Sequence, residues 1–544
     1  MTPNPQRQRL EGLFARGRIS RGQFLAGLAA CGLSAAAIEM LAGCEAALPD
    51  ESEAVAAYLC LIVLDGFRPD YLKLAEMPAF QELVQRGTFY ERAWVGQIES
   101  ETPTGHATIS TGSLPRHDGV IGFEWRDPVT RREVLDGWEQ GATLGRLGRE
   151  IERTHVNSIP QAIKRSDPSA VVVTASSEKV YAADAMSAHA ADYVLYHRLS
   201  EGAIIPSALP GRQPSPDVLT KPALTRQLPL QSFTDWDDVS TELALEAFSA
   251  YRPKALMLNL PGTDYYGHMF GGPASPGVMS TVVSGQDRNI GRVVDAYRKA
   301  GILDQTLFVV TADHGMVPNH HEVGPDSIEA AVDGAGASYL FHTGGTAKYI
   351  YLLDRDRKRA SYVAREVARL PGVVSAYYRA GANHYERAAP IHDSALDDAF
   401  RHLLGTFSGP SAPDVVAPYR ESTIGTSYPQ RYGNHGGLSW GAQAIPLLFA
   451  GPGVSQGVRS KMSARCVDIA PTVLRLLGLP STGMDGVVLS DAISGPTRDE
   501  VTGQAGLEVS LHKHQEALIG QSEMEQQEDR MRGIRRLPMS PLRP

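Results

Sequence analysis

The stretch Tyr58-Leu59-Cys60-Leu61-Ile62-Val63-Leu64 is a continuous apolar run, and Asp65-Gly66 follows it directly. A half-exposed strand alternates apolar and polar residues, whereas a central parallel strand is buried on both faces and needs no alternation. This stretch therefore predicts a buried parallel strand. Similar apolar runs recur along the chain at 170–174, 255–260, 307–311 and 445–450.

Helical patterns lie between these runs, at 77–86, 243–250, 278–299 and 469–477. Strands that alternate with helices predict an α/β fold, with a mostly parallel central sheet sandwiched by helices. The block 346–420 departs from this pattern, because it holds a strand, a helix and a second strand within one short local unit. We expect it to be a small inserted α+β subdomain that interrupts a main domain of 58–345 and 421–500.

Two further segments differ in composition from the rest. Residues 199–235 are rich in proline, serine and glutamine, and we expect them to form a loop over one face. Residues 501–544 are polar and charged, which indicates a C-terminal tail with a candidate helix near 511–530.

Residues 1–44 have the composition of an export signal. Five arginines precede a mostly apolar stretch that ends in Leu41-Ala42-Gly43-Cys44. This ending resembles a bacterial lipoprotein signal, in which the cysteine becomes the lipidated N-terminus, and 20–25 resembles a twin-arginine signal apart from Gly22. An uncleaved membrane anchor is the alternative, which Glu39 and the short run disfavour. Both alternatives place the chain in the periplasm or at the cell surface, and Cys44 with the linker 45–57 would tether it to a membrane.

Charge and cysteine content exclude other classes. The net charge of −9 leaves no basic surface for a nucleic-acid backbone. Cys60 lies within the first apolar run and Cys466 precedes an apolar helix, so we expect two buried free thiols, with a bridge between them as the alternative.

Metal-ligating side chains follow three of the predicted strands. In open α/β sheets, ligands bind beyond the carboxyl ends of the strands. Carboxylate and imidazole ligands together suit Zn²⁺, and six of them are enough for two sets of three. Two neighbouring divalent ions can hold both the attacking and the leaving oxygen at phosphorus, which predicts a two-metal hydrolase of anionic phosphate esters. The six candidates are Asp65, Asp264, His268, Asp313, His314 and, in a glycine-rich loop before the run at 445–450, His435.

The candidate nucleophile is Thr102. Pro103 follows it and Gly112 ends the pattern, so Thr102 is predicted as the N-cap of a helix, with Pro103 as the first helical residue. A hydroxyl there lies in the positive field of the helix N-terminus, and a metal ion beside it would lower its pKa further.

The ordered series resembles the alkaline phosphatase superfamily, and within it the type I phosphodiesterase/nucleotide pyrophosphatase branch. The resembling segments are 64–72, 102–115, Asp264 with His268, 312–316, and His435-Gly436. The resemblance implies an alkaline phosphatase-like fold and a covalent phosphothreonine at Thr102. It also implies that Asp264, His268 and His435 hold one metal ion, and that Asp65, Asp313 and His314 hold the other beside Thr102.

Two departures bear on the substrate. Phe123 stands where relatives of this branch place a phosphate-binding asparagine, and Lys179-Val180-Tyr181 keeps the lysine of a Lys-x-Arg pair but has Tyr181 for the arginine. Losing two donors weakens the binding of a dianionic monoester more than that of a monoanionic diester. We therefore expect a phosphodiesterase, with Phe123, Lys179 and Tyr181 at the substrate.

Other activities remain as alternatives. A phosphomonoesterase or phosphonate hydrolase of the same superfamily is the first of them. A non-catalytic lipoprotein that binds anions through its metal ions is the second. The Cys-x-Pro-x-Arg motif of sulfatases is absent from the sequence.

Overall fold

The computed structural model describes residues 54–136, 144–209, 216–228, 230, 232–381, 384–391, 393–407, 409, 411–425 and 432–531. The export segment with Cys44 lies outside these residues. Among the helices of the described part of the chain, none has the length and apolar character needed to span a bilayer. Cys60 and Cys466 are buried free thiols, as predicted.

The centre of the molecule is a ten-stranded sheet, ordered β21-β2-β20-β10-β1-β9-β5-β6-β7-β8. The five strands from β10 to β6 run parallel to one another, which confirms the mostly parallel sheet. In sheet order the strands are β21 (Val458–Arg465), β2 (Gly87–Trp94), β20 (Leu447–Ala450), β10 (Thr306–Thr311), β1 (Tyr58–Leu64), β9 (Ala255–Leu260), β5 (Val172–Ala175), β6 (Tyr193–Ser200), β7 (Ala203–Ala208) and β8 (Arg226–Gln227).

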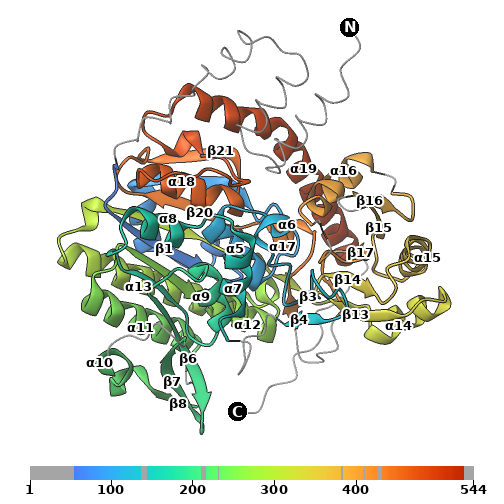
Figure 1. Ribbon diagram of the computed structural model, residues 1–544, viewed down its shortest axis with the longest axis horizontal. Helices are drawn as coiled ribbons and strands as arrows, with labels where there is room; N and C mark the ends of the chain where they lie inside the picture. The colour runs from blue at the N-terminus through green and yellow to red at the C-terminus, as the bar shows by residue number, and fades with distance from the viewer. Residues whose placement is uncertain are drawn as a thin grey trace. The chain divides into compact units, whose positions relative to one another are not determined.

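Helices cover both faces of this sheet, which explains the continuous apolar runs of its strands (Figure 1). From Leu59 onward, every side chain of β1 is fully buried. One group of helices comprises α4 (Pro78–Gln85), α11 (Asp235–Tyr251) and α13 (Pro276–Lys299). The other comprises α5 (Thr102–Thr111), α9 (Val180–Ser187) and α18 (Ile469–Leu476).

The prediction of a loop at 199–235 is wrong, because much of this segment forms strands that extend the central sheet. β7 turns back against β6 in an antiparallel hairpin, and β8 pairs with β7. Glu201 and Gly202 connect the hairpin, and both have positive φ angles, 46° and 78°. Two such residues suit the right-handed twist of a tight hairpin, but Glu-Gly is not among the pairs that usually predict one. The short helix α10 (Pro216–Leu219) follows.

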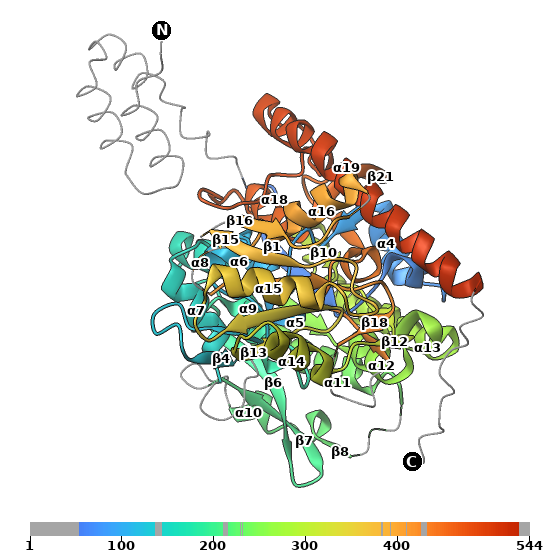
Figure 2. The same cartoon turned by 90° about the vertical axis from the view of Figure 1, so that its right-hand side faces the viewer.

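A second, five-stranded sheet lies in the region of the expected insertion, and Figure 2 shows it from the side on which α15 covers it. All its neighbouring strands are antiparallel, and it begins at Tyr339, slightly before the expected boundary. Its order is β13 (Tyr339–Thr343), β14 (Ala347–Leu352), β17 (Val415–Pro418), β15 (Tyr377–Gly381) and β16 (His384–Arg387). The helices packed with it are α14 (Pro325–Gly334), α15 (Arg357–Val367) and α16 (Ser394–Leu404).

The expected polar tail begins as a long helix, α19 (Arg498–Met531), which starts well before 511. It packs against α16 of the second sheet and against β21 of the central sheet (Figure 2). Arg92 on β2 bonds Glu516 at 2.6 Å, and Arg420 beside the second sheet bonds Glu528 at 2.8 Å. The helix therefore joins the two sheets rather than leaving the fold.

Candidate active site

Three carboxylates reach one edge of the central sheet. Asp65 follows β1, Asp313 follows β10, and Asp264 lies in the first turn of α12 (Gly262–Phe270), which begins just after β9. Because β1 runs parallel to both β9 and β10, the carboxyl ends of these strands lie side by side. His268 lies one turn after Asp264 on the same face of α12.

His435 reaches the same edge although it precedes its strand. β20 is antiparallel to β10, and Leu447 pairs with Thr311, so the chain enters β20 where β10 ends. A short antiparallel pair, β11 (Val317–Pro318) with β19 (Gly433–Asn434), holds the loop next to the segment that follows Asp313. All six ligand candidates are therefore brought together.

The first ligand set forms a compact triangle of donor atoms. Asp264 Oδ1 lies 3.3 Å from His268 Nε2 and 3.2 Å from His435 Nε2, and the two Nε2 atoms are 3.1 Å apart. Ligands that surround a tetrahedral zinc at its usual bond lengths stand about 3.3 Å apart. The spacing fits three ligands of one ion.

The second ligand set includes the threonine hydroxyl. His314 Nε2 lies 3.3 Å from Asp313 Oδ2 and 3.6 Å from Asp65 Oδ1. Thr102 Oγ1 lies 3.2 Å from His314 Nε2 and 3.5 Å from Asp65 Oδ1. His314 Nε2 is also 3.9 Å from Asp264 Oδ1, so this imidazole stands between the two sets.

Backbone carbonyls orient all three imidazoles. His268 Nδ1 donates to the carbonyl of Gly433 at 2.8 Å, and His314 Nδ1 donates to that of Gly315 at 2.9 Å. His435 Nδ1 donates to the carbonyl of Ser100 at 3.2 Å. A carbonyl can only accept, so the proton sits on Nδ1 and each Nε2 lone pair faces the site, as a metal ligand requires.

The donor atoms fit divalent cations. Asp264 Oδ1 and Asp313 Oδ2 are buried and have no hydrogen-bond donor among the described residues. Buried carboxylate oxygens without donors are costly unless a cation or another partner compensates them. Two such oxygens at the centres of the two sets agree with a pair of metal sites.

Thr102 is positioned by a close approach of α5 to the strand ends. The helix begins at Thr102, and the N-cap is Glu101, so the predicted N-cap position is wrong by one residue, while Gly112 ends the helix with a φ angle of 60° as expected. A Cβ on Gly105 would lie 2.5 Å from the carbonyl oxygen of Asp313. The absence of a side chain there lets α5 approach the ligands.

Lys179 lies inside the ligand cluster and is not a surface lysine. Its side chain is buried, and Nζ donates to Asp65 Oδ1 at 2.8 Å and to Asp264 Oδ2 at 2.5 Å. The same Nζ is 3.4 Å from Thr102 Oγ1. This ammonium offsets part of the negative charge of the carboxylates and stands beside the hydroxyl.

An aromatic wall lines the cavity in front of Thr102. Phe123 and Tyr181 meet edge to face, with their ring centroids 5.3 Å apart. Both rings line a cavity of about 310 Å³ together with Lys179 and Glu178. The two residues that replace the expected donors therefore line the same cavity as Thr102.

A family model described as type I phosphodiesterase/nucleotide pyrophosphatase matches residues 59–437. The chain belongs to this family. It is thus a member of the alkaline phosphatase superfamily and a hydrolase of phosphate esters, and the match spans every ligand candidate named above.

Individual relatives agree with this assignment. The chain is 23% identical over 504 residues to the alkaline phosphatase PhoK of a Sphingomonas species, covering 78% of this chain and 87% of the relative. It is 21% identical over 474 residues to the alkaline phosphatase PhoD of Zymomonas mobilis, covering 73% of this chain and 81% of the relative.

Solved structures show the same fold. The match to the alkaline phosphatase PafA covers 81% of this chain and 99% of the PafA chain, with a TM-score of 0.66 and 16% identity. The match to murine ectonucleotide pyrophosphatase/phosphodiesterase 5 covers 80% of this chain and 100% of the murine chain, with a TM-score of 0.58 and 17% identity.

Behind the ligands of this phosphodiesterase-family site lies a buried pair, His106 and Asn259, of which the sequence analysis missed Asn259. His106 Nδ1 faces the carbonyl of Thr102 at 2.8 Å, and its Nε2 faces Asn259 Oδ1 at 3.0 Å. Asn259 Nδ2 in turn donates to Asp65 Oδ2 at 3.1 Å. Burial alone would lower the pKa of His106, but Asp313 beside it raises that pKa above its ordinary value. The sequence signal for His106 is its position on α5, one helical turn after Thr102.

Burial sets the direction of the pKa shift for three groups of the site. Burial, with Asp313 nearby, raises the pKa of Asp65 to about 6. Burial and the adjacent His314 lower the pKa of His435 to about 3, so its ring is neutral at pH 7 and its lone pair is available to a metal ion. Burial also raises the pKa of Glu178, in the cavity wall, to about 7.

Proposed function

We propose that this enzyme cleaves phosphate esters with Thr102 as nucleophile, and that the two ligand sets hold two divalent ions, for which Zn²⁺ is best suited. The observation that carries the proposal is the position of Thr102 Oγ1. It lies 3.2 Å from His314 Nε2 and 3.5 Å from Asp65 Oδ1, at the first residue of α5. A hydroxyl placed among metal ligands at a helix N-terminus is suited to attack phosphorus.

The reaction follows from the groups around Thr102. Thr102 Oγ forms a bond to phosphorus as the bond to the leaving oxygen breaks, and the Thr102 proton passes towards Asp65. The leaving group departs as an alkoxide, which takes up a proton from water. Water then cleaves the phosphothreonine, which restores the hydroxyl and releases phosphate or a phosphate monoester. Lys179 and the positive end of α5 stabilise the negative oxygens of the phosphoryl group. Bound divalent ions would acidify the attacking hydroxyl and neutralise the leaving oxygen.

Relatives support the role of a threonine. An inactive variant of murine ectonucleotide pyrophosphatase/phosphodiesterase 5, in which one threonine is replaced by alanine, has been solved in complex with AMP. A variant of PafA alters a threonine, an asparagine, a lysine and an arginine together. This chain keeps a threonine and a lysine near the ligand sets, but has Phe123 and Tyr181 where the other two are expected.

We further propose a preference for phosphodiesters. A monoester brings two negative charges, and this cavity offers Lys179 as its cation next to the carboxyl of Glu178. A diester brings one negative charge and a second organic group, which Phe123 and Tyr181 can contact. Phosphomonoester and phosphonate hydrolysis remain the alternatives within the same chemistry.

The decisive experiment compares Thr102→Ala with Thr104→Ala, since both hydroxyls are buried on the same helix and Thr104 Oγ1 has no hydrogen-bond partner among the described residues. With zinc-loaded protein and bis(nitrophenyl) phosphate, Thr102→Ala should lose turnover while its metal content stays near that of the wild type. Thr104→Ala should remain active. Turnover retained in Thr102→Ala would exclude this nucleophile, and faster turnover of nitrophenyl phosphate than of the diester would exclude the substrate preference.

We also propose export and lipidation at Cys44, on the sequence of residues 1–44 alone. Expression of the full chain in a bacterium with labelled palmitate should label the membrane-bound protein, and Cys44→Ser should abolish the label. A labelled Cys44→Ser protein would contradict this assignment.

A further inference from the structure

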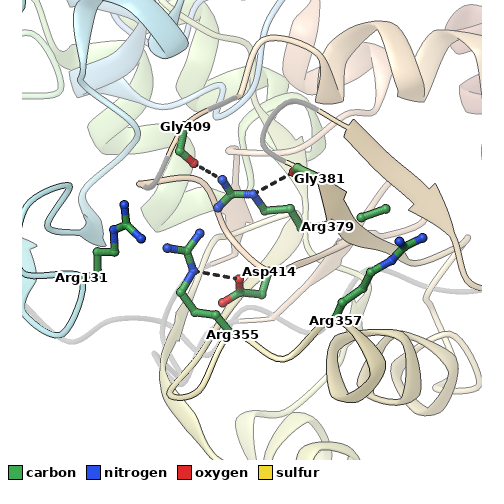
Figure 3. Close-up of a pocket in the computed structure, with 8 residues that line it drawn as sticks. Arg131, Arg355, Arg357, Arg379, Gly381, Gly409 and Asp414 are labelled. Carbon is green, nitrogen blue, oxygen red and sulfur yellow. Dashed lines mark hydrogen bonds and ion pairs between the residues drawn. The ribbon is translucent and has the colours of Figure 1, made fainter.

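Four arginines surround a cavity of about 420 Å³ at the second sheet, and this cavity shares no lining residue with the one in front of Thr102. Figure 3 shows the guanidinium groups of Arg131, Arg355 and Arg379 directed at the space in front of Asp414, with Arg357 at the opposite rim. The arginines come from three places in the chain. Arg131 lies in the turn between β3 (Glu124–Arg126) and β4 (Val134–Asp136). Arg355 lies just before α15, Arg357 is the first residue of α15, and Arg379 lies on β15.

The nearby carboxylate is already engaged by another arginine. Asp414 is buried, and both its oxygens contact Arg126, whose side chain is fully buried beneath the cavity. The backbone N–H of Leu352 also donates to Asp414 Oδ2 at 2.8 Å. Arg355 Nε approaches the same carboxylate at only 3.7 Å. Asp414 therefore balances Arg126 and leaves little negative charge for the arginines of the cavity.

The remaining contacts hold the guanidinium groups in place. Arg379 donates to the carbonyl oxygens of Gly381 at 3.2 Å and of Gly409, which carry no net charge. Arg357 bonds Glu386 at 2.8 Å. Asp414 and Glu386 are the carboxylates bonded to Arg126, Arg355 and Arg357, and the four guanidinium groups of the cavity lie around one space.

The backbone supports a binding role. Arg131 and Arg355 have positive φ angles, 61° and 54°, which a side chain of this size seldom adopts. Strained residues of this kind gather at ligand sites, where the surrounding structure holds them. The pKa of Arg355 is lowered by burial and by the neighbouring Arg126 and Arg379, so the group is held against the repulsion of like charges.

We infer that this cavity binds an anion carrying two or more phosphoryl groups, either as a free small molecule or as a lipid headgroup. Planar guanidinium groups bind phosphoryl oxygens through paired N–H donors, and several arginines around one space match several phosphoryl oxygens. A bound polyanion would place negatively charged oxygens among these guanidinium groups. The volume suits a ligand of small-molecule size.

The test uses the zinc-loaded full chain and measures binding of tripolyphosphate by calorimetry and of cardiolipin vesicles by flotation. The double variant Arg355→Gln/Arg379→Gln is compared with Arg369→Gln, which alters an arginine that is 71% exposed on the same subdomain. Binding to the metal ions near Thr102 is common to both proteins and cancels in the difference. Hydrolysis of bis(nitrophenyl) phosphate should be unchanged in both, so failure of this proposal is distinguishable from failure of the proposed reaction.

In the double variant, the affinity of one site per chain for tripolyphosphate should fall by at least about tenfold. The reason is that several charge-assisted hydrogen bonds are removed. Loss of vesicle binding without any tripolyphosphate site in the wild type would identify the lipid headgroup as the source. If the double variant fails to fold, Arg131→Gln, an exposed turn position, should weaken the same binding. Variants that bind both probes as Arg369→Gln does would overturn the inference.

Discussion

Replacing His106 with alanine should lower both stability and turnover. The ring is completely buried, and its two nitrogens face the carbonyl of Thr102 at 2.8 Å and Asn259 Oδ1 at 3.0 Å. The Thr102 carbonyl keeps the helical N–H of residue 106 as a donor, whereas Asn259 Oδ1 loses its donor, and a buried acceptor without its donor costs about 1–3 kcal/mol in the free energy of unfolding. Nδ1 also lies 3.3 Å from Asp313 Oδ2.

The same change should reach the chemistry through Thr102 and the ligand Asp65. His106 holds the backbone of Thr102 directly and holds Asp65 through Asn259. Loss of such supporting contacts typically costs about 10–100-fold in activity or metal affinity. Because the ring does not line the substrate cavity, the loss should fall on kcat more than on KM.

The assay is urea unfolding of the zinc-loaded proteins followed by circular dichroism, with steady-state hydrolysis of bis(nitrophenyl) phosphate on the same samples. His384→Ala is the matched control, since that side chain is 63% exposed and its replacement should change stability by less than about 0.5 kcal/mol. The reasoning is refuted if His106→Ala unfolds and turns over like His384→Ala.

Further outcomes are expected. Chelation should abolish turnover, and Asp264→Asn should lower the zinc content measured by atomic absorption by about one ion per chain, because this carboxylate belongs to the first ligand set. Phe123→Asn combined with Tyr181→Arg should raise kcat/KM for nitrophenyl phosphate relative to the diester, since it restores two donors at the cavity wall; an unchanged ratio would contradict the substrate assignment. Burial raises the pKa of Glu525 from 4.5 to about 7, so the folded state holds a proton that the unfolded state loses. Stability should therefore fall between about pH 4.5 and 7 by up to roughly 3 kcal/mol through this group, and Glu525→Gln should flatten that part of the curve in urea titrations.

The central sheet and the ligands at its edge could be predicted from the sequence. A continuous apolar run such as 58–64 indicates burial on both faces, and this requires helices on both sides of a parallel sheet. Parallel strands then place the residues that follow them at one edge, so Asp65 and Asp313 had to lie near each other. His435 was harder to place, because its position depends on β20 running antiparallel to β10, which no local pattern reveals.

The helix α19 was not predicted at its full length because its buried face is largely polar. The residues that it buries include Gln515, Ser522 and Glu525, and partners distant in sequence satisfy them. Glu525, for example, accepts from the backbone N–H of Glu421 at 2.6 Å. An apolar stripe at helical spacing is the signal that sequence analysis uses, and here tertiary hydrogen bonds take its place.

The substrate is harder to infer than the reaction for a related reason. The ligands follow strands whose register fixes their positions, whereas Phe123 precedes the β3–β4 hairpin and Tyr181 lies on α9. Neither element has a fixed register with the strand ends, so only the folded chain shows that the two rings meet at 5.3 Å beside Lys179. The same independence lets the wall of the cavity change without disturbing the ligand sets. The residues of the cavity wall can therefore diverge while the ligand candidates and Thr102 stay in place.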